Sequence, residues 1–156
     1  MFNIVLVTPQ IPNNTGAIGR LCVNTGSRLH LIKPLGFDIS EKALRRAGMD
    51  YWPKLDLKVW ESLEEFLEAH PRRDRFFFAT TKTDRPYFNL SFKEGDFFFF
   101  GSETSGLPPE LLADYPDQTV TIPMASEGRS LNLAISTGII LYDAIRQNFN
   151  AYQRLM

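Results

Sequence analysis

The chain has 156 residues, 44% of them apolar, which is enough for a domain with a hydrophobic core. Its formal net charge of −1 excludes a polycationic protein, so any contact with nucleic acid must come from local basic clusters. The single cysteine, Cys22, excludes an internal disulfide and a cysteine-rich metal site. Its apolar, helix-like surroundings favour a small buried hydrophobe over a nucleophile.

No segment has the pattern of a secretory leader, and none reaches the ~18 apolar residues of a membrane span. The sequence therefore favours a cytoplasmic protein, and we expect residues 1–156 to form one domain. His30 and His70 have no second histidine or cysteine at ligand spacing. We therefore expect no metal site and interpret both histidines as structural.

The first half of the chain alternates short apolar runs with helical patterns. We expect strands at residues 4–7, 29–32 and 57–60. A helix should run from Asn13 or Asn14 to about residue 24, with Ala17, Leu21 and Val23 as its apolar stripe and Gly26 at its end. A short basic helix should follow at residues 40–46, ended by Gly48, and another at 63–69, capped by Ser62 with Glu65 as the capping-box acid.

The second half continues the alternation. We expect strands at residues 76–80, 96–100 and 119–122, a short helix from Pro108 or Pro109 to 113, and the longest helix from Ser130 or Leu131 to about 149. The phenylalanine runs at 76–78 and 97–100 indicate strands buried on both faces rather than a base-stacking platform. Together the elements predict an α/β fold, a mostly parallel sheet with helices on both faces. The irregular stretch at 81–93 is long enough to suggest a functional loop.

Three segments rich in glycine, asparagine or serine follow apolar runs. They are residues 12–20 (PNNTGAIGR), 100–108 (FGSETSGLP) and 122–133 (IPMASEGRSLNL). Strand ends and helix starts are where an α/β sheet places its ligand site, so we expect these segments to meet there. The first has neither a dinucleotide fingerprint nor a phosphate-binding loop.

The residues of these segments allow more than one interpretation. Gly101 and Gly106 bracket a turn whose backbone is suited to reading an adenine edge, although a plain surface turn has the same spacing. Ser130 stands at a helix start and is interpreted either as a site residue or as an N-cap. Local basic clusters indicate either solvated faces or phosphate contacts. They are Lys42, Arg45 and Arg46, then Arg72, Arg73 and Arg75, with Arg20, Arg28 and Lys33 nearby in sequence.

In order and spacing, the three segments resemble the three motifs of the SPOUT methyltransferases. They are most similar to the small tRNA wobble-position ribose 2′-O-methyltransferases of the TrmL (YibK) type, and the resemblance covers nearly the whole chain, including residues 28–51. It implies S-adenosyl-L-methionine as the methyl donor and the 2′-hydroxyl of nucleotide 34, a cytidine or modified uridine in leucine tRNAs, as the acceptor. It further implies contact with the tRNA anticodon loop, a homodimer and a C-terminal deep trefoil knot, which ordinary topology rules nearly exclude.

The resemblance also assigns residues by position. It places the cofactor pocket at Ala79, Gly101, Glu103, Gly106, Ile122, Met124, Ser130 and Leu131. It ties catalysis or RNA binding to Asn14, Arg20, Glu103, Ser130, Asn132 and Tyr142. An arginine stays protonated, so we expect Arg20, supplied across the dimer, to orient the acceptor or stabilise charge rather than act as a base. Tyr142 fits core or dimer packing about as well as a site role.

The chain departs from the family pattern at several positions. Ser102 replaces a common proline, Ser105 replaces an arginine found in some relatives, and residues 134–136 read Ala-Ile-Ser instead of Ser-Asn-Ala. The changes at Ser102 and at residues 134–136 should tune loop packing. Ser105 lacks the positive charge of the arginine, so the resemblance gives no basis for an RNA contact by a cation in this loop. Gly138 interrupts the longest helix, which either close approach in a dimer or packing within the chain explains.

Two other functions remain open. One is a related SPOUT enzyme that acts on ribosomal RNA or another tRNA nucleotide, although the lack of an extra RNA-binding segment favours a small, exposed target such as an anticodon loop. The other is a non-catalytic RNA-binding or assembly protein that retains the fold. Binding of S-adenosyl-L-methionine separates the last from both enzymes.

Overall fold

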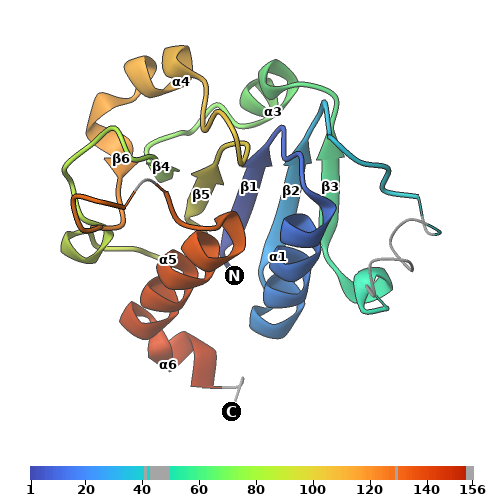
Figure 1. Ribbon diagram of the computed structural model, residues 1–156. Helices are drawn as coiled ribbons and strands as arrows, with labels where there is room; N and C mark the ends of the chain where they lie inside the picture. Colours follow the sequence, from blue (N-terminus) through green and yellow to red (C-terminus); the bar gives the residue numbers. More distant parts are fainter. Residues whose placement is uncertain (41, 43–49, 129, 154–156) are drawn as a thin grey trace.

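The apolar runs form the strands of a six-stranded sheet, in which every hydrogen-bonded pair is parallel. The computed structural model describes residues 1–40, 42, 50–128 and 130–153. The strand order is β3-β2-β1-β5-β4-β6 (Figure 1). The strands are β1 (Asn3–Val7), β2 (Arg28–Ile32), β3 (Leu57–Trp60), β4 (Phe76–Ala79), β5 (Phe97–Phe100) and β6 (Thr119–Val120). The predicted parallel sheet is confirmed, whereas the trefoil knot stays a prediction.

Helices cover both faces of the sheet, as predicted. On one face α1 (Pro12–Thr25) and α5 (Leu133–Gln147) lie side by side (Figure 1). On the other face lie α3 (Leu63–Ala69) and α4 (Pro109–Asp114). The remaining elements are α6 (Phe149–Tyr152) and the 3-10 turns η1 (Trp52–Lys54), η2 (Tyr87–Asn89) and η3 (Pro116–Gln118). Most of the basic helix expected at residues 40–46, and the stop expected at Gly48, lie outside the described residues.

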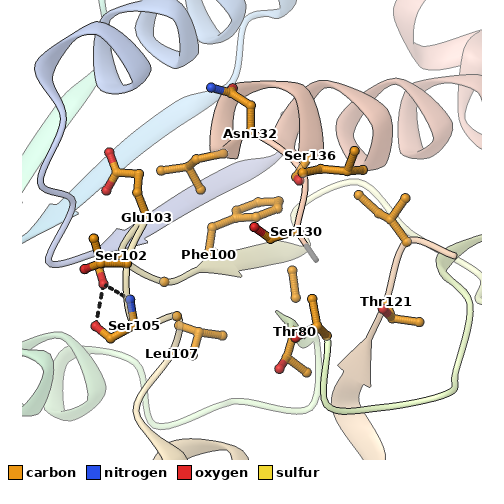
Figure 2. Close-up of a pocket in the computed structure, with 18 of the residues that line it drawn as sticks. Thr80, Phe100, Ser102, Glu103, Ser105, Leu107, Thr121, Ser130, Asn132 and Ser136 are labelled. Atoms are coloured by element: carbon orange, nitrogen blue, oxygen red, sulfur yellow. Dashed lines mark hydrogen bonds between the residues drawn. The ribbon is translucent and has the colours of Figure 1, made fainter. Parts of the chain in front are cut away.

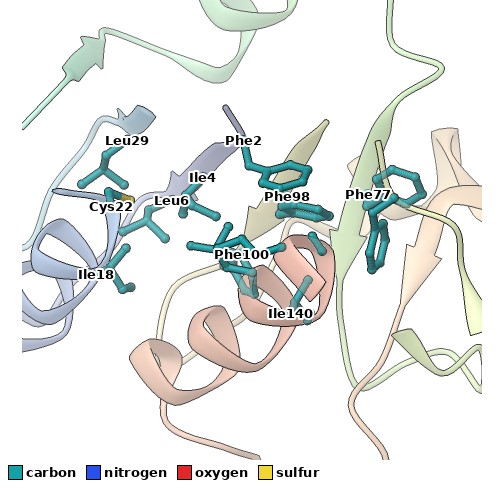
Figure 3. Close-up of a cluster of buried hydrophobic side chains, with 14 of the residues drawn as sticks. Phe2, Ile4, Leu6, Ile18, Cys22, Leu29, Phe77, Phe98, Phe100 and Ile140 are labelled. Atoms are coloured by element: carbon teal, nitrogen blue, oxygen red, sulfur yellow. The ribbon is translucent and has the colours of Figure 1, made fainter. Parts of the chain in front are cut away.

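Alternating side chains of the sheet fill two separate apolar clusters. Along β1, Ile4 and Leu6 point toward α1 and α5, whereas Val5 and Val7 point toward α3 and α4. Figure 3 shows the first cluster, with Cys22 of α1 beside strand residues such as Leu6. The phenylalanine runs supply both clusters, which confirms that β4 and β5 are buried on both faces. Cys22 is fully buried, and burial raises its pKa to about 12, so it is a buried hydrophobe as expected.

The start and the buried stripe of α1 differ from the prediction. Its N-cap position is Ile11, with no side-chain cap, so neither Asn13 nor Asn14 caps the helix. The buried apolar residues are Ile18 and Cys22, not the expected stripe of Ala17, Leu21 and Val23, of which Ala17 is exposed and the other two are half-buried. The small residues Gly16, Gly19 and Thr15 complete the buried face. Because these residues are small, the spacing of large apolar side chains does not reveal this face.

Two further helix ends agree with the sequence. Gly26 ends α1 in the left-handed conformation, with φ of 66°. Ser62 caps α3, accepting a hydrogen bond from the Glu65 amide at 3.1 Å. The described residues include no helix that is long and apolar enough to cross a membrane. They also bring no group of three His, Cys, Asp or Glu side chains together as metal ligands.

Two arginines of the second basic cluster have structural partners. Arg75 donates to buried Asp96 through Nε at 2.8 Å and Nη2 at 2.6 Å. Arg73 donates to the carbonyl oxygens of Leu67 at 2.6 Å and His70 at 2.9 Å, at the end of α3. Both arginines therefore already have hydrogen-bond acceptors within the protein, and their presence needs no phosphate contact to explain it.

Candidate active site

A cavity of about 460 Å³ opens at the carboxyl edge of the sheet. Its walls come from the ends of β4, β5 and β6 and from the starts of α1 and α5 (Figure 2). The strand order reverses between β1 and β5, so the cavity lies beside the switch point, where open α/β sheets bind ligands. Its size is within the usual range for a small-molecule site.

The structure brings most of the predicted site residues together. Those that line the cavity are Asn14, Ala79, Gly101, Glu103, Gly106, Ile122, Met124, Ser130, Leu131 and Asn132. Arg20 and Tyr142 do not line it: they lie on α1 and α5, and both are exposed. The binding and catalytic roles of all these residues stay predictions.

Several polar residues of the walls were not among the predicted site residues. Thr80 and Lys82 follow β4, Thr121 follows β6, and Ser136 lies in the first turn of α5. In Figure 2, Thr80 and Thr121 face the loop of Ser102 and Ser105 across the cavity. The predicted strands at 76–80 and 119–122 included Thr80 and Thr121, whereas the observed strands end at Ala79 and Val120 and leave both threonines at the cavity.

The loop after β5 packs against its own backbone. A Cβ on Gly101 would lie 1.9 Å from the carbonyl carbon of Gly106 and 2.1 Å from the amide nitrogen of Leu107. Gly106 itself has φ of 71°, in the left-handed region that favours glycine. The two glycines therefore let the chain fold back tightly and present its backbone to the cavity.

Ser102 and Ser105, the two serines that depart from the family pattern, hold this loop closed. Their hydroxyl oxygens, Oγ of Ser102 and Oγ of Ser105, lie 2.7 Å apart and share a hydrogen bond. The Ser105 amide donates to the Ser102 Oγ at 3.1 Å, and the Gly106 amide donates to the Ser102 carbonyl at 3.0 Å. These bonds give Ser102 and Ser105 a structural role in the turn.

Glu103 ties this loop to the start of α1. One carboxylate oxygen accepts a hydrogen bond from the Gln10 amide at 2.8 Å. The other accepts from the Ile11 amide at 2.8 Å and from Nδ2 of Asn14 at 3.2 Å. Burial raises the pKa of the Glu103 carboxyl, but the hydrogen bonds it accepts outweigh burial and hold the pKa below its ordinary 4.5. An ionised carboxylate thus lies at the positive end of α1, where no side chain of the helix itself serves as cap.

Asn132 joins the third segment to the first. It is the N-cap of α5, so the prediction that the helix begins at Ser130 or Leu131 was wrong, as was the alternative that Ser130 is a cap. Its Oδ1 accepts from the amides of Ala134 at 2.8 Å and Ile135 at 3.2 Å. Its Nδ2 donates to Oδ1 of Asn14 at 2.9 Å. Glu103, Asn14 and Asn132 therefore form one hydrogen-bonded chain through all three segments.

Comparison with known proteins agrees with this arrangement. The sequence model of the SpoU rRNA methylase family matches residues 1–142. A tRNA (cytidine(34)-2′-O)-methyltransferase of Methylovorus glucosotrophus is 48% identical over 149 residues, which cover 95% of this chain and 96% of that protein.

Two solved structures extend the comparison. One, described as giving structural insights into the 2-OH methylation of C/U34 on tRNA, has a TM-score of 0.89 at 44% identity, covering 96% of this chain and 97% of that one. The SpoU methyltransferase AviRb from Streptomyces viridochromogenes, in complex with AdoMet, has a TM-score of 0.80 at 25% identity, covering 94% and 57%. With motifs, cavity and fold in agreement, this chain belongs to the SpoU rRNA methylase family.

Proposed function

We propose that this chain transfers the methyl group of S-adenosyl-L-methionine to the ribose 2′-hydroxyl of cytidine 34 or uridine 34 in tRNA. The observation that carries the proposal is the meeting of all three segments at one cavity, held by the hydrogen bonds of Glu103, Asn14 and Asn132. Relatives matched over nearly their full length are named tRNA (cytidine(34)-2′-O)-methyltransferases, which supports the proposal.

The residues of the cavity fit S-adenosyl-L-methionine. Phe100, Leu107, Ile122, Leu131 and Leu133 offer apolar surface to an adenine ring. The backbone of the Gly101–Gly106 loop and the hydroxyls of Thr80, Thr121, Ser130 and Ser136 offer hydrogen bonds to polar edges. When bound, the cofactor supplies a sulfonium methyl group that is already activated for displacement. The protein must then orient the acceptor hydroxyl and ease loss of its proton.

A homodimer completes the proposed site. Large apolar side chains form an exposed stripe along α5: Ile135 is 56% exposed, Tyr142 52% and, just beyond the helix, Phe149 44%. Gly138 lies on the same face, and a Cβ there would meet no described atom within 4 Å, so packing within the described chain does not explain this glycine. A second copy covering this stripe would bury it. Arg20 does not line the cavity of its own chain, which supports its action at the cavity of the partner.

The experiment is methyl transfer to purified tRNA. Leucine tRNAs with cytidine or modified uridine at position 34 are incubated with the protein and S-adenosyl-L-methionine, and 2′-O-methylation is mapped along the RNA. We expect one modified ribose, at nucleotide 34, and none on a matched tRNA that carries a 2′-deoxy nucleotide there. Methylation of another nucleotide or of ribosomal RNA would favour the related enzyme. A folded protein that shows no binding of S-adenosyl-L-methionine in calorimetry would favour the non-catalytic protein.

A further inference from the structure

The segment that begins at Tyr51 packs against the face of α1 that carries Gly16 and Gly19. A Cβ on Gly19 would lie 3.0 Å from Cζ3 of the Trp52 ring and 3.4 Å from Cδ2 of Leu55. Any larger residue at position 19 would therefore push the Trp52 ring away. Both Trp52 and Leu55 pack against the main apolar cluster, which anchors the segment to the body of the protein.

Tyr51 spans one turn of α1 from this anchored position. Its hydroxyl donates a hydrogen bond to the carbonyl oxygen of Gly16. Its ring lies under the guanidinium of Arg20, with 4.8 Å between the Arg20 Cζ and the ring centroid. This distance is within the ~6 Å range of a cation–π contact. Tyr51 thus holds both the backbone and the side chain of the same helical turn.

The Arg20 guanidinium has a ring beneath it but no counter-ion in the described part of the chain. The ion pairs found there do not include Arg20, and the side chain is exposed. Within that part of the chain its charge is exposed and not neutralised, as a contact with an anionic partner requires. A long exposed arginine loses side-chain entropy when it is fixed for such a contact, and a stacked ring reduces that loss by restricting the side chain beforehand.

The environment of the Tyr51 hydroxyl agrees with this role. Burial raises its pKa above the ordinary 10, while the charge of Arg20 and hydrogen bonds from Arg20 act in the opposite direction. The net shift is upward, so the hydroxyl stays protonated at neutral pH and remains a donor to Gly16.

We propose that Tyr51 is a positioning residue, which holds the Arg20 guanidinium in the orientation that meets the RNA acceptor. This inference rests on the proposed function, in which Arg20 acts on the acceptor at the cavity of the partner. Tyr51 does not line the cavity and is assigned no contact with the cofactor. Its effect should therefore appear in turnover and not in cofactor binding.

The test is a kinetic comparison of Tyr51→Leu with Tyr51→Phe on tRNA. Removal of the ring in Tyr51→Leu should lower kcat about tenfold, with KM for S-adenosyl-L-methionine unchanged. Tyr51→Phe keeps the ring and should retain kcat within about twofold. Tyr115→Leu is the matched control, because Tyr115 is also half-buried and its hydroxyl accepts from Arg73 at 3.3 Å, on the far face of the sheet. It should leave kcat unchanged.

A double-mutant cycle with Arg20→Ala decides whether Tyr51 acts through Arg20. We expect Tyr51→Leu to cause no further loss of kcat in the Arg20→Ala background. Equal losses in both backgrounds, or a folded Tyr51→Leu variant with wild-type kcat, would overturn the proposal. A wild-type protein that does not methylate nucleotide 34 refutes the proposed function instead, and this appears before any variant is compared.

The contact itself has a readout that needs no activity. Tyr51 ionisation is followed by tyrosinate absorbance, as the difference between chains with Tyr51 and with Tyr51→Phe. Since Arg20 lowers this pKa, Arg20→Ala should raise it further. An unchanged titration would show that ring and guanidinium are not in contact, which also overturns the proposal.

Discussion

Asn132 donates a hydrogen bond from its Nδ2 to Oδ1 of Asn14 at 2.9 Å, although 118 residues separate the two in sequence. Each asparagine uses both ends of its amide. Asn132 also caps α5, and Asn14 also donates to Glu103 at 3.2 Å. A change in one amide therefore affects two walls of the cavity at once.

Asn14→Asp should disrupt this chain of hydrogen bonds. It replaces the donor that faces the ionised Glu103 with a second carboxylate, and two like charges at that separation repel. We expect a lower Tm and about tenfold weaker binding of S-adenosyl-L-methionine by calorimetry. Asn13→Asp is the matched control, because Asn13 is exposed in the same turn and an acid near a helix start is mildly favourable. Equal effects of both substitutions would contradict the prediction.

Gly101→Ala should force the tight loop after β5 apart. The added Cβ would overlap the backbone of Gly106 and Leu107, which cannot move aside as the end of a flexible side chain can. We expect loss of cofactor affinity of more than about tenfold, measured by calorimetry, together with a lower Tm. Ser105→Ala removes only a hydroxyl contact to Ser102 and should weaken binding far less. Tight binding by the Gly101→Ala protein would show that the loop does not shape the cofactor site.

Arg20→Ala should separate turnover from cofactor binding. Arg20 does not line the cavity of its own chain, so we expect the affinity for S-adenosyl-L-methionine to stay within about twofold. Turnover on tRNA should fall at least ~10²-fold, as when a group that stabilises transition-state charge is removed. Arg28→Ala breaks only a surface pair with Asp56 and should lower turnover much less. Near-wild-type turnover would remove Arg20 from the reaction.

Ile135→Glu should dissociate the proposed dimer. It places a charge at the N-terminal end of the exposed apolar stripe of α5, where an interface would leave that charge buried and unpaired. We expect light scattering to show a dimer for the wild-type protein and association weakened about 10²-fold or more for the variant. Ala113→Glu adds the same charge to an exposed position on α4, across the sheet, and should remain dimeric. A monomeric wild-type protein would reject the dimer outright.

Stability should fall in mild acid because of His30. Burial, followed by the charges of His70 and Arg28, lowers the pKa of His30 to about 3. The neutral ring accepts from Trp60 at Nδ1 and donates from Nε2 to Asn3. An unfolded histidine binds its proton near pH 6.5, so the stabilising effect is complete above that pH and is lost as pH falls from about 6.5 toward 3.

Urea unfolding between pH 7.5 and 4 measures this effect. Below pH 6 the contribution of His30 should decrease by about 1.4 kcal/mol per pH unit. A His30→Asn protein should be less stable at pH 7.5 but should lose stability less steeply as the pH falls. Parallel curves for the two proteins would show that His30 titrates normally in the folded state.

The sheet and the place of the site were predictable because their signals are local. A continuous apolar run such as Phe97–Phe100 has few alternatives to a buried parallel strand, and its bounds agreed to within one residue. Segments that follow parallel strands must meet at one edge, so their joint cavity followed from the order of elements.

The connections between segments were not predictable in the same way. The start of α1 looked like a cap by Asn13 or Asn14, yet its Ile11 amide is held by Glu103, 92 residues further along. The contact of Tyr51 with Arg20 is likewise tertiary, since no spacing rule relates a residue after one strand to a helix before it. Local patterns locate elements, whereas these contacts depend on how the elements are packed.

The double use of Asn132 also limits how the protein can respond to a ligand. A shift of α5 along its axis, or a rotation against α1, would pull Oδ1 away from the first amides of the helix or Nδ2 away from Asn14. Either movement would cost Asn132 its bond to Asn14 or its cap on the helix. Asn132 therefore couples the start of α5 to α1, and a ligand that displaced one helix without the other would have to break this contact.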